Sequence, residues 1–180
     1  PADQGALAAI PWRTAFTGHL HNKIVHFPLA LGLAAAAFFL VAPTLGGILF
    51  QWPIGRTSDK GSRRAVILTV AVIGSALSMT LMVVPEQSVV VPMLMVCLGG
   101  MLYPLYSLVV SFALDWTPDG KTVGAAATLI RINGSGALVG PLAAAPLMSG
   151  LGPRWFFWAG TITFGAIAVQ VLWRIVVVEA

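Results

Sequence analysis

Charged residues are scarce in this sequence, at 9% of its 180 residues, whereas a soluble globular domain has about 25%. Hydrophobic residues make up 58%, and the mean hydropathy is +0.90. A surface this poor in charge would expose apolar patches to water, which excludes a soluble enzyme. The same hydrophobicity excludes a disordered segment, because such segments need high charge. The composition therefore predicts an integral membrane protein.

The sequence lacks the residues that several other kinds of functional site require. Cysteine occurs once, as Cys97, which excludes an internal disulfide and a CxxC metal site. All six acidic residues lie in expected connections or at chain ends, so we expect no proton relay from this chain alone. The sequence shows no Ser/His/Asp set, phosphate-binding loop or carboxylate pair. We therefore expect no enzymatic activity.

Five apolar runs are long enough to cross a bilayer, which takes about 20 helical residues. We place the spans at about residues 34–54, 65–84, 89–114, 123–148 and 155–178. The predicted fold class is all-α, a polytopic transmembrane helix bundle of about five spans over residues 34–180. The apolar run before residue 54 is too long for one span and too short for two. Residues 1–33 are therefore expected to form an outer or interfacial segment.

The basic residues indicate an orientation. Four of the ten, Arg56, Lys60, Arg63 and Arg64, fall within residues 55–64. The positive-inside rule places this connection and the C-terminus in the cytoplasm and the N-terminus outside. Because the basic charge sits in one short connection, not across a broad face, we expect no nucleic-acid partner. The expected partner is the lipid bilayer.

The same connection, Gly55-Arg-Thr-Ser-Asp59-Lys-Gly-Ser-Arg63-Arg64, has a pattern of its own. Glycine at a helix end allows close approach of a neighbouring helix. An acid there can pair with a basic residue or cap the next helix, and such a contact can hold one conformation. We therefore interpret Gly55, Asp59, Arg63 and Arg64 as a candidate latch. The alternative is a solvated positive-inside loop. The pattern resembles G-x-x-x-D-x-x-G-[RK]-[RK] of the major facilitator superfamily, with Ser62 at the second glycine.

Three further segments resemble a bacterial exporter branch of that superfamily. They are Gly46–Gly55, similar to its eighth helix, Gly99–Ser107, similar to its tenth, and Gly134–Pro141, similar to its eleventh. The resemblance implies that residues 35–180 correspond to helices eight to twelve, a partial C-terminal half. It also implies a secondary transporter of the bacterial inner membrane that moves a small solute by alternating access.

Small residues and prolines predict helix packing in these segments. Gly136-x-x-x-Gly140 is a small-xxx-small face, and Pro141 favours a kink. The third span has the same features, which are Gly99, Gly100 and Pro104. We interpret both sets as packing positions, with a hinge as an additional role.

Four polar residues inside the spans are candidates for a solute cavity, because polar groups in the membrane are costly. They are Arg131, Asn133, Tyr103 and Tyr106. Arg131 would bind an anion or a carboxylate of a missing half. Alternatively, Arg131 snorkels toward the cytoplasmic side, and the other three are satisfied within helix packing.

Five spans do not enclose a cavity of the kind held between two transporter halves. We therefore expect either a missing half or, alternatively, an accessory scaffold subunit of a larger respiratory or photosynthetic complex. Residues 15–40, with Val25-His26-Phe27-Pro28, resemble an uncharacterised family of small bacterial membrane proteins. His19 and His26 share a helical face there. Haem or pigment ligation by them would need partners from another helix or chain, so we expect no cofactor.

Overall fold

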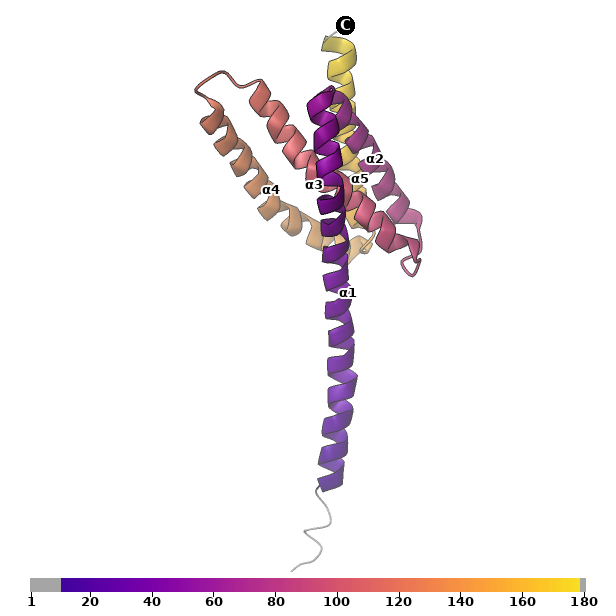
Figure 1. Ribbon diagram of the computed structural model, residues 1–180. Helices are drawn as coiled ribbons and strands as arrows, with labels where there is room; N and C mark the ends of the chain where they lie inside the picture. The colour runs from indigo at the N-terminus through magenta and orange to yellow at the C-terminus, as the bar shows by residue number, and fades with distance from the viewer. Residues whose placement is uncertain (1–10, 179–180) are drawn as a thin grey trace, which may run out of the picture. The chain divides into compact units, whose positions relative to one another are not determined.

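The computed structural model describes residues 11–178, and it describes side chains for residues 29–30, 32–34 and 36–177. This part of the chain is helical between short connections, without a strand. The helices are α1 (Pro11–Lys60), α2 (Arg63–Val83), α3 (Val90–Asp115), α4 (Thr122–Leu151) and α5 (Trp155–Trp173), followed by the π-helix η1 (Arg174–Val178). The all-α prediction is confirmed (Figure 1).

Five helical segments of the described chain are long and apolar enough to cross a membrane, as predicted. They are Gly32–Lys60, Arg63–Val83, Val90–Asp115, Thr122–Leu151 and Trp155–Val177. The first segment continues as a helix to Lys60, whereas the sequence suggested an irregular connection from residue 55. Its 29 residues extend about 44 Å at 1.5 Å per residue, which exceeds the roughly 30 Å of hydrocarbon. α1 is therefore long enough for its charged C-terminal end to extend beyond the hydrocarbon layer of the membrane.

The chain divides into two compact units, residues 1–41 and residues 42–180. Within the first unit, residues 11–41 are one continuous stretch of α1, including Pro28. The sequence analysis placed the division earlier, between residues 33 and 34. The structure divides the chain where packing starts, because Ala42, 4% exposed, is the first buried side chain among those described.

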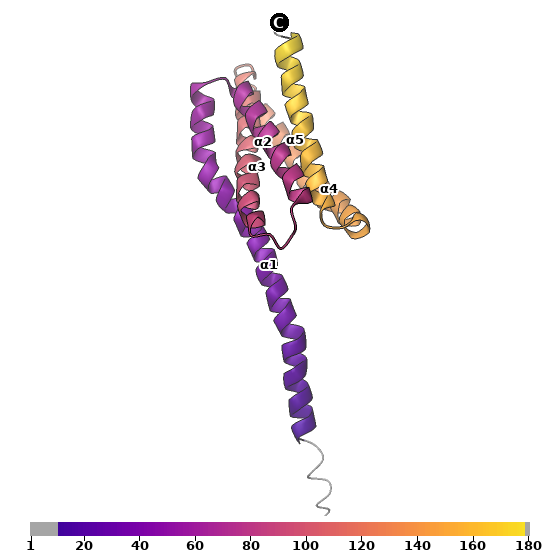
Figure 2. The same ribbon diagram turned by 90° about the vertical axis from the view of Figure 1, so that its right-hand side faces the viewer.

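The core of the second unit lies where α2 packs on α3 and α5 (Figure 2). Small residues on α2 allow this contact: a Cβ on Gly74 would lie 2.6 Å from the Phe164 ring of α5. The Ser75 hydroxyl donates a hydrogen bond of 3.2 Å to the Thr161 carbonyl on α5. The buried apolar residues of this core are Ile67, Val70, Ala71, Met101, Leu105, Leu108 and Phe164.

α4 differs from the other helices of the second unit because it has no buried residue. Its apolar side chains, such as Leu138 and Leu142, are exposed. In lipid, exposed leucines cost nothing, since the tails are as apolar as the side chains. α4 therefore has side chains available for lipid or for protein outside the described residues.

Candidate functional site at the charged end of α1, α2 and α3

Two residues, Gly61 and Ser62, connect α1 to α2. The Gly61 amide donates to the Thr57 carbonyl at 3.1 Å and so closes the last turn of α1. Ser62 is the N-cap of α2, and its hydroxyl oxygen accepts from the Ala65 amide at 3.5 Å. A serine is a preferred N-cap, whereas the superfamily pattern has glycine at this position. The replacement therefore supplies a cap and keeps the turn short.

Arg63, the first residue of α2, is held by carboxylates from two other helices. Its Nη1 lies 3.1 Å from Oδ2 of Asp115, the last residue of α3. Its Nη2 lies 3.5 Å from Oδ1 of Asp59 on the last turn of α1. The Arg63 side chain is 28% exposed, against 51% for Asp115 and 72% for Asp59. One guanidinium thus joins the charged ends of three helices.

Asp115 was not among the site residues that the sequence analysis singled out. The signal was present, because Asp115 ends the third span on the same membrane side as residues 55–64. Sequence spacing favours Asp59, four residues before Arg63, since i and i+4 are neighbours on a helix. The structure has the shorter contact at Asp115, because α2 packs against α3 and brings this distant residue to Arg63.

The close approach of α1 and α3 depends on glycines from both helices. A Cβ on Gly46 would overlap the Val96 carbonyl, and one on Gly99 would overlap the Pro43 backbone. A Cβ on Gly100 would lie 2.6 Å from the Phe50 ring. Close approach therefore requires glycine at these positions, which places Gly99 and Gly100 in helix packing. The buried Pro104 lies one turn further along α3.

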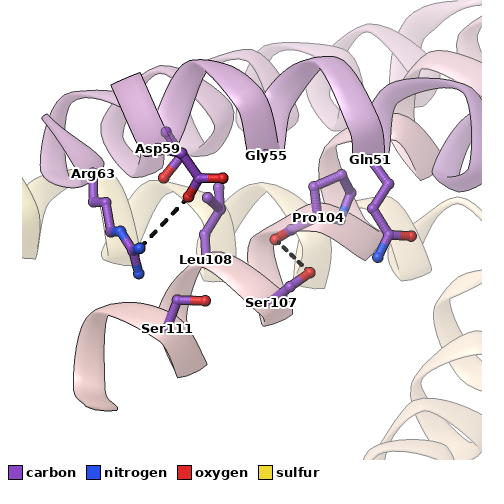
Figure 3. A pocket seen from close by; sticks show the side chains of 9 residues that line it. Gln51, Gly55, Asp59, Arg63, Pro104, Ser107, Leu108 and Ser111 are labelled. Carbon is purple, nitrogen blue, oxygen red and sulfur yellow. Dashed lines mark hydrogen bonds and ion pairs between the residues drawn. The ribbon is translucent and has the colours of Figure 1, made fainter. Parts of the chain in front are cut away.

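A polar cavity of about 210 Å³ lies between α1 and α3 beside this network (Figure 3). Its lining residues are Gln51, Gly55, Ser58, Asp59, Arg63, Pro104, Ser107, Leu108 and Ser111. The Ser107 hydroxyl donates to the Pro104 carbonyl at 3.2 Å. Ser58 is buried, at 3% exposed. The glycine, acid and first arginine of the motif therefore line one cavity.

Arg64, the second arginine of the motif, is placed over aromatic rings. Its Cζ lies 5.4 Å from the ring centroid of Phe112 and 5.3 Å from that of Trp116. Such contacts are favourable cation–π interactions. The sequence analysis grouped Arg64 with Arg63 in the candidate latch, whereas the structure gives the two arginines different surroundings.

Comparison of the sequence with known proteins identifies a family. The sequence model of the Major Facilitator Superfamily matches residues 5–180. The chain belongs to this superfamily. Proteins named "Uncharacterized MFS-type transporter YcaD" from Salmonella arizonae, Salmonella paratyphi B and Salmonella newport are each 30% identical over 118 residues. The aligned part covers 64% of this chain and 29% of each relative. No solved structure matches the chain.

The chain therefore spans less than a third of the length of these superfamily relatives. The superfamily match starts at residue 5, so it includes residues 15–40, for which the sequence analysis also considered another family. The side chains of His19 and His26 lie outside the described residues. Among the residues that are described, no three His, Cys, Asp or Glu side chains gather as a metal site would require.

The other glycine motif of this superfamily member lies in a different environment. A Cβ on Gly136 or on Gly140 would meet no atom of the described residues within 4 Å. Both glycines lie on α4, which also contains Pro141 and has no buried residue. Within the described residues, the small-xxx-small face of α4 therefore has no packing partner.

The four candidate cavity residues are not among the residues that line the polar cavity. The Tyr103 ring packs at Gly47, and its hydroxyl lies 3.4 Å from the Thr44 hydroxyl. Tyr106 is half-exposed on the same helix. Arg131 and Asn133 are exposed on α4. The structure thus gives Tyr103 a packing contact with α1 and leaves the two α4 residues on an open surface.

Another ion pair joins two connections near the opposite end of α2. Arg154, which precedes α5, has its Nε 3.4 Å from Glu86 Oε1. Its Nη1 donates to the Met82 carbonyl in the last turn of α2 at 3.4 Å. Sequence analysis did not find this pair, because its members are separated by 68 positions. An arginine therefore links α2 to another element at each of its ends.

Proposed function

We propose that this chain forms part of a secondary transporter, which moves a small solute across a bacterial inner membrane by alternating access. Membership of the superfamily and the printed names of the relatives support a transporter. The observation that carries the mechanism is Arg63 between Asp115 and Asp59. In this proposal the orientation is the predicted one, with the charged ends of α1, α2 and α3 in the cytoplasm.

The Arg63 network acts as a latch that favours one of two conformations. Both carboxylates are at least half exposed, and ion pairs of this kind contribute about 0–1 kcal/mol each. One kcal/mol changes the ratio of two states about fivefold. The network is thus strong enough to bias a conformational equilibrium and weak enough for both states to be visited.

The solute lies between this chain and a second transporter half, as is general for such transporters. The exposed face of α4 supports this arrangement, because its glycines allow another helix to approach closely. In the proposal Arg131 and Asn133 face the second half and contact an anionic part of the solute. Tyr103 and Tyr106 on α3 complete the polar lining.

The latch is tested by the reactivity of a cysteine in the polar cavity of the full-length protein. Ser111→Cys, in a Cys97→Ala background, reports how readily N-ethylmaleimide reaches this cavity in membrane vesicles. Asp115→Asn added to this background should raise the alkylation rate severalfold, because Arg63 loses its closer carboxylate. Asp59→Asn should raise it less, because its contact is longer and more exposed.

Asp119→Asn is the matched control, since it removes the same charge four positions beyond Asp115 from an exposed site. Equal rates in the Asp115 and Asp119 variants would exclude a latch at Arg63. Transport itself is measured by untargeted mass spectrometry of solutes inside and outside cells that express the wild type or the Asp115 variant. Stoichiometric purification with a larger complex, together with unchanged solute levels, would favour the accessory-subunit alternative.

A further inference from the structure

The two arginines at the start of α2 occupy an electrostatically unfavourable place. Ser62 is the N-cap of α2, so Arg63 and Arg64 are its first two helical residues, and the first turn of α2 has no acidic residue. The N-terminus is the positive pole of a helix macrodipole, where a cation is disfavoured. Both arginine charges are therefore stabilised by groups outside α2.

The end of α3 contacts both arginines through one of its faces. Phe112, Asp115 and Trp116 are spaced i, i+3 and i+4, so they are neighbours on the same side of this helix end. The end is the negative pole of the α3 dipole, and its last turn has no basic residue of its own. Arg63 Nη1 lies 3.1 Å from Asp115 Oδ2, and Arg64 Cζ lies 5.4 Å and 5.3 Å from the ring centroids of Phe112 and Trp116.

The ring contacts bear on the choice that Arg63 makes between two carboxylates. Arg63 lies 3.1 Å from Asp115 on α3 and 3.5 Å from Asp59 on α1. Arg63 and Arg64 belong to one helical turn, so an attraction of Arg64 toward α3 also holds Arg63 toward α3. The contact with the rings therefore favours Asp115 over Asp59 as the partner of Arg63.

The strength of such contacts is sufficient for this role. A cation–π interaction at an exposed site changes an equilibrium about two- to fivefold, which is comparable to the effect of an exposed ion pair. The rings of Phe112 and Trp116 are 6.2 Å apart, so both lie beside the same guanidinium. We propose that Phe112 and Trp116 are positioning residues, which hold Arg64 and thereby direct Arg63 to Asp115. This inference rests on the latch proposed above and identifies side chains that regulate it.

A second arginine–tryptophan contact provides a matched control. Arg56 Cζ lies 5.4 Å from the ring centroid of Trp52. Trp52 and Trp116 are each 69% exposed. Trp52 and Arg56 are both on α1, four residues apart, so their contact joins no two helices. Trp52→Leu therefore removes an equally exposed ring from an arginine without changing the contact between α2 and α3.

The experiment measures alkylation of Ser111→Cys by N-ethylmaleimide in the full-length Cys97→Ala protein, with and without Trp116→Leu. Arg64 has interactions besides these ring contacts, so the experiment changes the ring and leaves the arginine in place. Trp116→Leu should reduce the rate increase caused by Asp115→Asn about two- to fivefold, because Arg63 is then no longer directed to Asp115. The rate increase caused by Asp59→Asn should become larger, because Arg63 then depends more on Asp59.

Opposite changes at the two aspartates support the positioning role, because a merely loosened structure would change both in the same direction. Trp116→Phe keeps an aromatic face and should retain most of the Asp115→Asn effect, and Trp52→Leu should leave both effects unchanged. Parallel changes, or no change, in the Trp116→Leu background would overturn the positioning role and leave the latch standing. The latch itself fails on a different result, which is equal rates for the Asp115 and Asp119 variants with all rings present.

Discussion

Arg63 Nη1 and Asp115 Oδ2 are 3.1 Å apart, although 52 positions of the chain separate the two residues. The contact joins the first residue of α2 to the last residue of α3. Asp59 approaches the same guanidinium from α1 at 3.5 Å. Three helix ends therefore share one cation, and the strength of each contact can be measured separately.

The ion pair of Arg63 with Asp115 is expected to stabilise the fold modestly. Asp115→Asn should lower the free energy of unfolding by about 0.3–1 kcal/mol, because partly exposed ion pairs have this strength. Asp59→Asn should cost less, owing to its longer and more exposed contact. Unfolding titrations in detergent would measure both values. Adding Arg63→Gln completes a double-mutant cycle with Asp115, and a coupling energy of zero would contradict the pairing.

Gly99 should be far less tolerant of substitution than Gly136. Gly99→Ala should lower the melting temperature by several degrees and cost about 1–3 kcal/mol, because its Cβ overlaps the Pro43 backbone. Gly136→Ala meets open space in the described chain, and alanine is the better helix former. The melting temperatures of the two variants are compared by tryptophan fluorescence. A larger loss at Gly136 would instead show that its face packs against another part of the full-length protein.

Truncation of two serines on α2 to alanine should change the stability of the protein in opposite directions. Ser78 Oγ is buried and, within the described chain, has no hydrogen-bond partner. Ser78→Ala should therefore stabilise the protein by about 1 kcal/mol, the lower end of the penalty for an unsatisfied buried hydroxyl. Ser75 donates to the Thr161 carbonyl, so Ser75→Ala should destabilise by about 0.5–1.5 kcal/mol. Thermal unfolding of both variants shows whether each substitution raises or lowers the stability. Destabilisation by Ser78→Ala would reveal a partner for that hydroxyl.

The proposed orientation can be tested with two single-cysteine variants in a Cys97→Ala background. Ser62→Cys lies between α1 and α2, and Gln87→Cys lies between α2 and α3. A membrane-impermeant maleimide should label Ser62→Cys in inverted vesicles and Gln87→Cys in spheroplasts, because the basic connection stays in the cytoplasm. The reverse labelling pattern would invert the proposed topology.

Much of the fold was predictable, because the bilayer restricts the possibilities. In lipid every backbone group must be paired within its own helix, so an apolar run of about 20 residues indicates a helical span. The exact ends of the helices were harder to predict from the sequence. Lys60 remains in α1 and Arg63 starts α2, since a long helix can extend beyond the hydrocarbon and a serine N-cap needs only a two-residue turn.

The candidate site was predictable in part. Gly55, Asp59 and Arg63 were recognisable by local spacing, and they line one cavity. Asp115 was not, because its contact with Arg63 depends on how α3 packs against α2. Arg64 was grouped with the ion pairs, since sequence shows its charge and does not show the rings of Phe112 and Trp116 above which it lies.

Composition and the length of the apolar runs alone determined that this protein is a membrane-spanning helical bundle, because hydrophobicity summed over 20 residues is a property of each segment by itself. Which glycines pack was decided only in three dimensions. Gly99 and Gly136 look alike in the sequence, yet one lies against the Pro43 backbone and the other has no neighbour within 4 Å among the described residues. The reason is that close packing depends on the partner helix, and a partner is a property of the tertiary structure.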